Sequence, residues 1–203
     1  MQIKSKYKIA RRLNSPIFEK TQTQKFALSL AKRKESSKKR PKMLSDYGRQ
    51  LLEKQKIRYT YLMNERQLKK YVRSVLLKKG VKQDEKLYEI LETRLDNTAY
   101  RLGFGPSRLA VRQIVNHGHI LLNGKRVNIP SCHIKVGDKI TIRPNSLKKG
   151  AFMTLEERLK DWKAPNWLRF DPDKKEGIVS SLPKIDRGDT AGDLNMVLEY
   201  YKR

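Results

Sequence analysis

Residues 107–127 read SRLAVRQIVNHGHILLNGKRV, and the hydrophobic period changes within this stretch. Over residues 108–116 apolar side chains recur with the 3.6-residue period of a helix that buries one face. Gly118 is typical of a left-handed helix stop, and Asn123-Gly124 is the dipeptide most favoured in two-residue hairpin loops. The stretch therefore predicts a helix that leads into an antiparallel hairpin.

The flanking residues extend this pattern in both directions. Leucine and alanine residues share one helical stripe over about residues 86–102, which predicts one continuous helix before the stretch. Isoleucine and valine alternate over residues 134–142 around Gly137, which predicts a turn and a further strand. Cap residues predict two more helices, one beginning near Ser45 and one near Asn64. The expected fold class is α+β and mostly helical, an N-terminal helical domain followed by a small module of a helix pair and an antiparallel sheet.

The charge of the chain is strongly positive and unevenly distributed. Against 21 Asp and Glu the chain has 47 Lys and Arg, which gives a formal net charge of +26. The net charge is +19 over residues 1–79 (24 basic, 5 acidic), +6 over residues 80–162 (15 and 9) and +1 over residues 163–203 (8 and 7). Such a chain repels itself unless a polyanion neutralises it, so nucleic acid is the expected partner. The sequence contains no run of about 18 apolar residues, so no membrane span is predicted and no membrane partner is expected.

Changes in charge and periodicity divide the chain into four expected segments. They are a basic N-terminal arm (1–42), a helical RNA-binding domain (43–93), a helix-pair and hairpin RNA-binding module (94–158) and a C-terminal segment (159–203). The arm shows little periodicity, which predicts that its partner orders it. The C-terminal segment should contain a short strand and a terminal helix that packs back on the helical domain.

The residues with catalytic or metal-binding potential do not form a recognised pattern. His117 and His119 are two residues apart, one at a helix end and one at a strand start, and no Cys, Asp or Glu lies close by to complete a ligand set. Cys132 is the single cysteine, and neither a GxSxG motif nor a P-loop is present. Asp96 fits a structural hydrogen-bonding role better than that of a general base. We therefore predict no catalytic residue, no metal and no cofactor, and His117 is left with two roles, RNA contact or local hydrogen bonding.

One half of the predicted helix over residues 108–116 is polar. Arg108, Arg112 and Gln113 lie on this half, and guanidinium groups form paired hydrogen bonds with phosphate. A solvated face is the simple alternative. Other basic residues nearby in the sequence, on the preceding helix and at the hairpin tip, favour an RNA-binding face instead.

The module and its flanks resemble a known protein family. The sequence RLDNTAYRLGFGPSRLAVRQIVNHGHILLNGKRVNIPS (94–131), followed by VGDKI (136–140), closely resembles the RNA-binding module named after small-subunit ribosomal protein four. The flanks SDYGRQLLEKQKIRYTY, NERQLKKY, PNWLRFD and LEYYKR resemble the bacterial-type ribosomal protein family itself. Because the arm has no cysteines, the chain resembles the zinc-free form of that family.

The resemblance implies a structural constituent of the small ribosomal subunit. Such a protein would be a primary binder of small-subunit rRNA at a multi-helix junction and would nucleate assembly of the subunit body. It would contribute to translational accuracy with ribosomal protein five and contact other small-subunit proteins, and mRNA near its entry site is a further partner that the resemblance allows. The expected location is a bacterial-type cytoplasmic ribosome, with an organellar ribosome as the alternative. Two other functions are kept open: an RNA-modifying enzyme anchored by the same module, and a free RNA chaperone or translational repressor.

The expected RNA contacts combine the basic faces with the family motif. They are Arg49, Lys54, Lys56, Arg58, Arg66, Arg94, Arg101, Ser107, Arg108, Arg112, Gln113, His117, Lys125 and Arg126.

Overall fold

A computed structural model describes residues 3, 5–36, 44–147, 150–160, 162–185 and 190–202, and these form two compact units. Unit 1 consists of Met1–Leu87 and Ile185–Arg203, and unit 2 of Tyr88–Lys184. Helices predominate, and the strands of the described residues form one antiparallel sheet. The predicted α+β, mostly helical fold class is confirmed. In the described ranges, no helix is both long and apolar enough to span a membrane.

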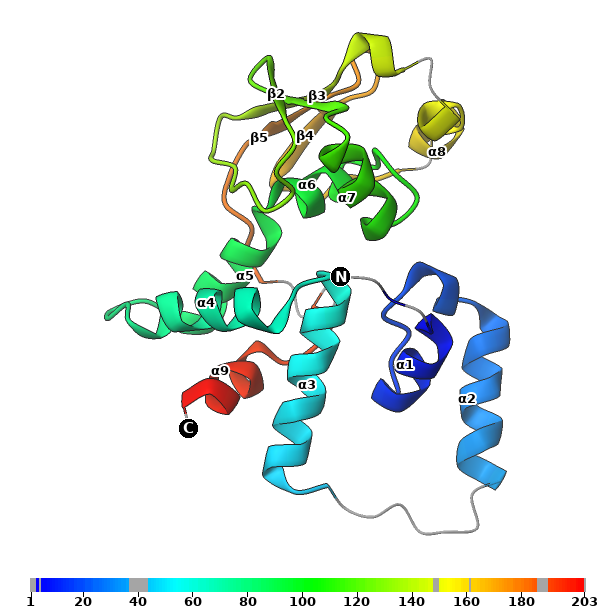
Figure 1. The fold of residues 1–203 in the computed structure, drawn as a ribbon, viewed down its shortest axis with the longest axis vertical. Coiled ribbons are helices and arrows are strands. Elements are labelled where there is room, and N and C mark those ends of the chain that lie inside the picture. The colour runs from blue at the N-terminus through cyan, green and yellow to red at the C-terminus, as the bar shows by residue number, and fades with distance from the viewer. Residues whose placement is uncertain are drawn as a thin grey trace. The chain divides into compact units, whose positions relative to one another are not determined.

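Unit 1 is helical. Its main helices are α3 (Asp46–Thr60) and α4 (Glu65–Leu76), and α9 (Leu194–Lys202) packs against both, as Figure 1 shows. The Ser45 side chain caps α3 by accepting a hydrogen bond from the backbone N–H of Gly48 (3.2 Å). At the start of α9, Asp193 caps through its carboxylate, which accepts from the N–H groups of Asn195 and Met196. Helix α4 is strongly amphipathic, with Leu68, Val72 and Val75 buried.

The N-terminal arm contains regular helices, although its sequence shows little periodicity and predicts a segment that a partner orders. It contains α1 (Lys6–Leu13), a 3₁₀ turn (Glu19–Thr21) and α2 (Gln24–Ser36). Ala10, Leu13, Phe18 and Phe26 form a small core together with Leu62 from the end of α3. The apolar residues that build this core are widely separated in the sequence, since Phe18 lies between α1 and α2 and Leu62 follows α3, so no single helical stripe is visible. The basic run from residue 37 to residue 43 lies outside the described residues.

Unit 2 places a helix pair on a five-stranded sheet. Helices α6 (Leu95–Arg101) and α7 (Arg108–Asn116) precede β1 (Ile120–Leu122), β2 (Lys125–Val127) and β3 (Lys139–Ile142), and β4 (Leu168–Asp171) and β5 (Glu176–Val179) complete the order β2-β1-β3-β5-β4. Short elements join them: the 3₁₀ turns Pro144–Ser146 and Gly150–Phe152, and α8 (Leu155–Lys160).

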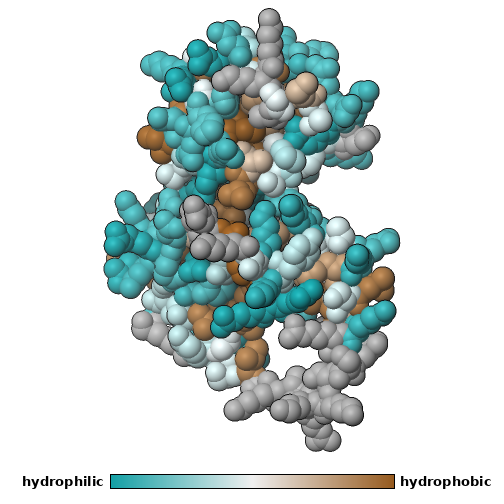
Figure 2. Space-filling view, turned by 45° about the vertical axis from the view of Figure 1, so that its right-hand side comes forward, coloured by the Kyte–Doolittle hydropathy of each residue, from teal (hydrophilic) through white to brown (hydrophobic). Residues whose placement is uncertain are grey.

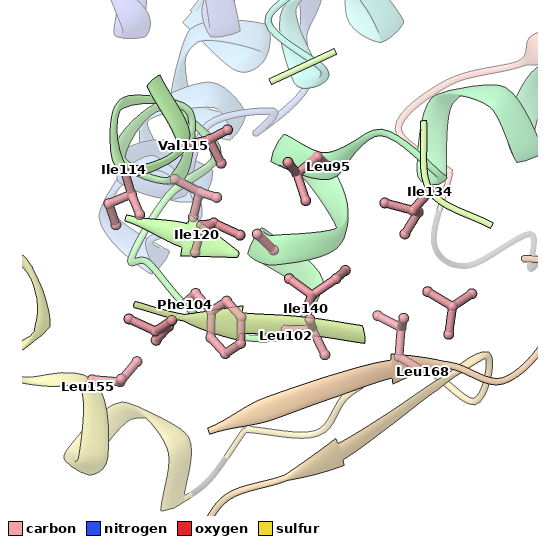
Figure 3. Packing of buried hydrophobic residues seen from close by; sticks show 14 of the residues in the cluster. Leu95, Leu102, Phe104, Ile114, Val115, Ile120, Ile134, Ile140, Leu155 and Leu168 are labelled. Atoms are coloured by element: carbon pink, nitrogen blue, oxygen red, sulfur yellow. The ribbon is translucent and has the colours of Figure 1, made fainter. Parts of the chain in front are cut away.

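The helix pair and the sheet share one apolar core. Leu95 and Leu102 of α6, Ile114 of α7, and Ile120 and Ile140 of the sheet meet there, as Figure 3 shows. All five are at most 5% exposed. Figure 2 shows the complementary pattern, since hydrophilic side chains predominate on the described surface of each unit that faces the viewer. The apolar half of α7 therefore fixes this helix, and its polar half is left at the surface.

The turn chemistry predicted for residues 107–127 is confirmed. Ser107 accepts a hydrogen bond from the Ala110 N–H (3.2 Å), which caps α7. Gly118 has a φ of 68°, and Asn123 and Gly124 have φ values of 50° and 77° in the two-residue loop between β1 and β2. These positive angles are those that a left-handed helix stop and a type I′ hairpin turn require.

The continuous helix predicted over residues 86–102 is wrong, because the chain breaks at Thr93 and Arg94. Helix α5 (Gln83–Glu92) ends there and α6 begins at Leu95. Thr93 is a turn residue and Arg94 is extended, and both pair with the loop before β3: the Ile134 N–H donates to the Thr93 carbonyl (2.9 Å), and Arg94 forms a β-bridge with His133. At this break, backbone pairing with residues that are distant in the sequence replaces helical hydrogen bonds.

The structure also divides residues 159–203 in a way that differs from the single C-terminal segment expected. Strands β4 and β5 extend the sheet of unit 2, because Ile140 of β3 is in register with Gly177 of β5. Helix α9 belongs to unit 1. The short strand expected near Gly177 is present as β5. A side chain at Gly177 would clash with Leu102, whose Cδ1 lies 2.4 Å from an ideal Cβ position, so glycine is required for the close approach of α6 to the sheet.

Candidate nucleic-acid interface

Two buried carboxylates, Asp96 and Glu92, organise the arginines of the helix pair. Asp96 accepts hydrogen bonds from Arg94 (Nε, 3.0 Å; Nη2, 2.7 Å) and from Arg112 (Nε, 3.0 Å; Nη2, 2.6 Å). Glu92 is fully buried and accepts from Arg101 (Nε, 2.9 Å; Nη2, 3.2 Å). The structural role predicted for Asp96 is confirmed. A charged hydrogen bond to each guanidinium fixes its orientation, and a buried carboxylate needs such partners.

Asn97 connects this arrangement to Arg108. The Asn97 Nδ2 donates to Glu92 Oε2 (2.9 Å), and its Oδ1 accepts from Arg108 Nε (3.0 Å). The guanidinium of Arg108 also lies 4.4 Å from the ring centroid of Tyr100, within the range of a cation–π contact. We call the set of Glu92, Arg94, Asp96, Asn97, Arg101, Arg108 and Arg112 the arginine–carboxylate network. Its four guanidinium groups outnumber its two carboxylates, so the net charge of the network is positive.

The exposed part of α7 adjoins the hairpin tip. Gln113 and His117 are exposed on α7, and Lys125 and Arg126 are exposed on β2. Arg126 Nη2 donates to the backbone carbonyl of His117 (3.1 Å), which joins the end of the helix to the hairpin. These four residues, together with Ser107, Arg108 and Arg112, are termed the α7–hairpin surface.

Gly118 is part of the same junction. An ideal Cβ at this position would lie 2.0 Å from Arg126 Nε, so the arginine crosses directly over the glycine. Glycine is needed at this position for two reasons: the backbone φ is positive, and the Arg126 side chain approaches closely.

The remaining histidines have structural surroundings. His119 Nδ1 is 2.9 Å from Ser146 Oγ, and its ring packs edge-on against Phe152. Burial and the Arg94 charge lower the pKa of His133 below its usual value. Within the described ranges, no group of three or more His, Cys, Asp or Glu side chains is arranged to hold a metal ion.

Unit 1 presents a second basic surface, on α4. Arg66, Lys69, Lys70 and Arg73 are all exposed, opposite the buried apolar face of this helix. We call these four residues the α4 basic face. Among the expected contacts only Arg66 comes from it. The alternation of basic and apolar residues at helical spacing is visible in the sequence, and it could have identified the other three.

The basic residues of α3 are mostly bound by carboxylates. Arg49 is exposed and paired with Asp46, and Lys56 Nζ is 2.6 Å from Glu53 Oε1. Arg58 Nη1 lies 3.3 Å from Glu65 Oε2, and its guanidinium lies over the Tyr59 ring. These three side chains are at or near the surface.

The structure does not bring Lys54 and Arg94 to the surface, which corrects two of the expected contacts. The Lys54 side chain is 6% exposed, and its Nζ lies 2.9 Å from Glu65 Oε1 and 4.3 Å from the centroid of the Tyr200 ring. The Arg94 side chain is 1% exposed. Both were expected to contact RNA from an exposed helix face, but each has a carboxylate partner supplied by the fold, Glu65 for Lys54 and Asp96 for Arg94.

Glu65 is the centre of a polar cluster between α3, α4 and α9. Its Oε1 accepts from Lys54 and from the Tyr201 hydroxyl (2.6 Å). Burial acts to raise the pKa of Glu65, but the hydrogen bonds from Tyr201 and Lys54 and the nearby Arg58 charge outweigh it, and the pKa is lowered. The pKa of Tyr201 is raised by burial and by the Glu65 carboxylate.

This cluster predicts an acid-sensitive fold in unit 1. The pKa of Glu65 is lower in the folded chain than its ordinary value of 4.5, so its stabilising effect is complete above pH 4.5 and is lost as the pH falls through the folded pKa. Glu65→Gln cannot titrate and should lose less stability than the unsubstituted chain over this range. Urea denaturation of both proteins at neutral pH and below pH 4.5 measures the difference. Parallel losses in the two proteins would exclude Glu65 as a source of the pH dependence.

Comparison with known proteins agrees with this architecture. A family model described as the ribosomal protein S4/S9 N-terminal domain matches residues 2–92, and one described as the S4 domain matches residues 93–140. Three relatives carry the name small ribosomal subunit protein uS4. The one from Dehalococcoides mccartyi is 45% identical over 164 residues, covering 81% of this chain and 79% of the relative. The one from Roseiflexus castenholzii is 40% identical over 203 aligned residues (97% and 96%), and the one from Syntrophomonas wolfei is 42% identical over 159 residues (78% and 76%). The similarity spans both units, and the chain belongs to the family of small ribosomal subunit protein uS4.

Proposed function

We propose that this chain is a structural, RNA-binding constituent of the small ribosomal subunit. The observation that carries the proposal is that each unit has its own basic surface, the α4 basic face in unit 1 and the α7–hairpin surface in unit 2. Two such surfaces on one chain with a net charge of +26 suit a large folded polyanion. The name carried by the relatives, small ribosomal subunit protein, supports rRNA as that polyanion.

The mechanism that we infer is electrostatic and geometric. Lys and Arg side chains on the two surfaces neutralise phosphates and release counterions. The arginine–carboxylate network holds Arg101, Arg108 and Arg112 in fixed orientations, which lowers the entropic cost of binding a phosphate group. Gln113 and His117 add hydrogen-bonding groups that suit sugar hydroxyls or base edges.

The proposed contacts are the surface members of the expected set. They are Arg49, Lys56, Arg58, Arg66, Arg101, Ser107, Arg108, Arg112, Gln113, His117, Lys125 and Arg126, to which Lys69, Lys70 and Arg73 are added. Lys54 and Arg94 are assigned a structural role instead, because both are buried against carboxylates.

Finer assignments follow from the family resemblance and form part of the proposal. The RNA site is a multi-helix junction of small-subunit rRNA, and binding there nucleates assembly of the subunit body. The chain contributes to translational accuracy with ribosomal protein five, near the mRNA entry site, on a bacterial-type cytoplasmic ribosome. It has no enzymatic activity. Support for this last point comes from the relatives, whose shared name is that of a ribosomal protein.

Co-sedimentation tests the ribosomal role. The protein expressed in a bacterial host should be recovered in stoichiometric amounts with small subunits, and it should remain there after a wash at moderate salt. Recovery mainly in the ribosome-free fraction would favour a free chaperone or repressor. Formation of modified nucleotides by the purified protein on transcribed rRNA would establish the enzyme alternative.

Neutralising the hairpin tip tests the α7–hairpin surface. Lys125→Gln with Arg126→Gln removes two exposed charges without touching the buried network, and the slope of log affinity against log salt for small-subunit rRNA should fall by about one per lost phosphate contact. The matched control is Lys174→Gln with Lys184→Gln, which removes two exposed charges elsewhere in unit 2. Equal slopes for the two double variants would remove the hairpin tip from the interface.

A further inference from the structure

Unit 2 contains a pocket between α7 and the segment that leads into α8. Its volume is about 350 Å³. Ala110 and Ile114 of α7 form an apolar wall, Gln113 and His117 of the same helix lie at its polar side, and Thr154 and Arg158 close it from the opposite segment. This α7–α8 pocket shares Gln113 and His117 with the α7–hairpin surface, so it opens within the region proposed to contact RNA.

Arg158 is the distinctive residue of this pocket. Its Nε and Nη2 atoms are shielded from solvent and have no hydrogen-bond partner within the described part of the chain. Burial lowers the pKa of this guanidinium. Arg94, Arg101 and Arg112 in the same unit are each held by a buried carboxylate. Among the described residues, no carboxylate is paired with Arg158 at the wall of this pocket, which favours an anionic ligand there.

The position of Arg158 is fixed by the core. Phe152, Leu155 and Leu159 are buried in the apolar cluster of unit 2, and Figure 3 shows Leu155 in that cluster. Leu155 and Leu159 are one helical turn apart and hold one side of α8 against the core, which leaves Arg158 at the pocket. On the other side, His119 is held by Ser146 and packs against Phe152. The segments on both sides of the pocket are thus held by the core of unit 2, so its walls are formed before a ligand arrives.

The lining selects a ligand that is both anionic and partly apolar. An apolar wall and an imidazole suit the face of a nucleobase, the Gln113 amide can donate to and accept from a base edge, and the Arg158 guanidinium suits a phosphate. The volume lies at the small end of the range for ligand pockets, which is enough for one nucleotide and too little for a duplex.

We propose that the α7–α8 pocket receives one unpaired nucleotide of the bound RNA, with its phosphate near Arg158 and its base against Ala110 and Ile114. This proposal rests on the proposed function and adds a specific recognition element to it. A splayed-out base can be read by stacking and by its edges, which the paired part of an RNA helix does not permit to the same degree.

Chemical probing of the complex tests the proposal. The full chain is bound to small-subunit rRNA, and the Watson–Crick edges of unpaired nucleotides are modified with a base-specific reagent. Arg158→Gln removes the charge, and Ala110→Leu fills the pocket while every charge is kept. Both variants should restore reactivity at the same unpaired nucleotide, which the unsubstituted chain protects. Each should also weaken binding by about fivefold or more, the smallest loss expected when one stacked base is released.

The control is Arg169→Gln, which removes an exposed arginine on β4 outside the pocket. It should leave the protection pattern unchanged. Melting temperatures of the three variants establish that each is folded before the probing is interpreted. Unchanged protection in both pocket variants, or a uniform loss of protection over the whole site, would overturn the pocket proposal while leaving the proposed function intact. Absence of any protection by the unsubstituted chain would overturn both.

Discussion

Asp96→Ala should lower the free energy of unfolding by about 3–5 kcal/mol, the usual cost of removing one partner from a buried ion pair. Asp96 is the acceptor for both Arg94 and Arg112, whose side chains are 1% and 16% exposed. Without the carboxylate, the Arg94 charge remains buried and loses the partner that accepts from its Nε and Nη2. Urea denaturation of the purified chain measures the loss.

Asp46→Ala is the matched control for this substitution. Asp46 is also paired with an arginine, Arg49, but both side chains are more than half exposed, and an exposed pair contributes at most about 1 kcal/mol. Equal losses in the two variants would show that the arginine–carboxylate network does not stabilise unit 2. The same contrast explains why Arg112→Ala cannot by itself test RNA contact, because this change also disrupts the network.

Replacing the whole α4 basic face with glutamine should produce the largest effect on RNA binding. The four substitutions are Arg66→Gln, Lys69→Gln, Lys70→Gln and Arg73→Gln. If each side chain contacts a phosphate, the slope of log affinity against log salt falls by about four, roughly one per residue. Over a fourfold change in salt concentration, this difference in slope corresponds to a change in relative affinity on the order of a hundredfold. Filter binding to small-subunit rRNA over a series of salt concentrations measures the slope.

A control with the same change in charge separates local contacts from net charge. Lys163→Gln, Arg169→Gln, Lys174→Gln and Lys184→Gln remove four exposed charges from the C-terminal part of unit 2. This variant should retain most of the original slope. Similar slopes in the two quadruple variants would mean that the chain attracts RNA through its overall charge, and the α4 basic face would then not be a binding surface.

Local sequence signals predicted the parts of the fold that depend on short-range chemistry. The Asn123-Gly124 loop, the Gly118 stop and the Ser107 cap each depend on a few adjacent residues, and all three were confirmed. The apolar stripe of α4 likewise follows from residues within a single helix.

Features of the fold that depend on residues distant in the sequence could not be predicted from local sequence signals. The apolar stripe that suggested one helix over residues 86–102 continues across Thr93 and Arg94, so the break follows from pairing with Ile134 and His133, which are distant in the sequence. The small core of the arm was missed for the same reason, because Leu62 completes it from the end of α3.

The same limit applies to the basic residues of the candidate site, because their carboxylate partners cannot be predicted from the local sequence. The sequence predicted that Arg94 and Lys54 face a partner, because nothing in a helical pattern distinguishes a solvated cation from one held by a buried carboxylate. Arg94 is paired with Asp96 only because the chain is extended at residue 94 and turns into α6. Lys54 is paired with Glu65 because α3 and α4 pack together with α9.

A backbone footprint of the full chain on small-subunit rRNA tests the central claim most directly. The two basic surfaces predict a compact set of protected phosphates grouped at one multi-helix junction, and the α4 and hairpin variants should each lose a different part of that set. Protection that is spread evenly along the RNA, or that disappears uniformly in both variants, would contradict the assignment of this chain as a site-specific rRNA-binding protein.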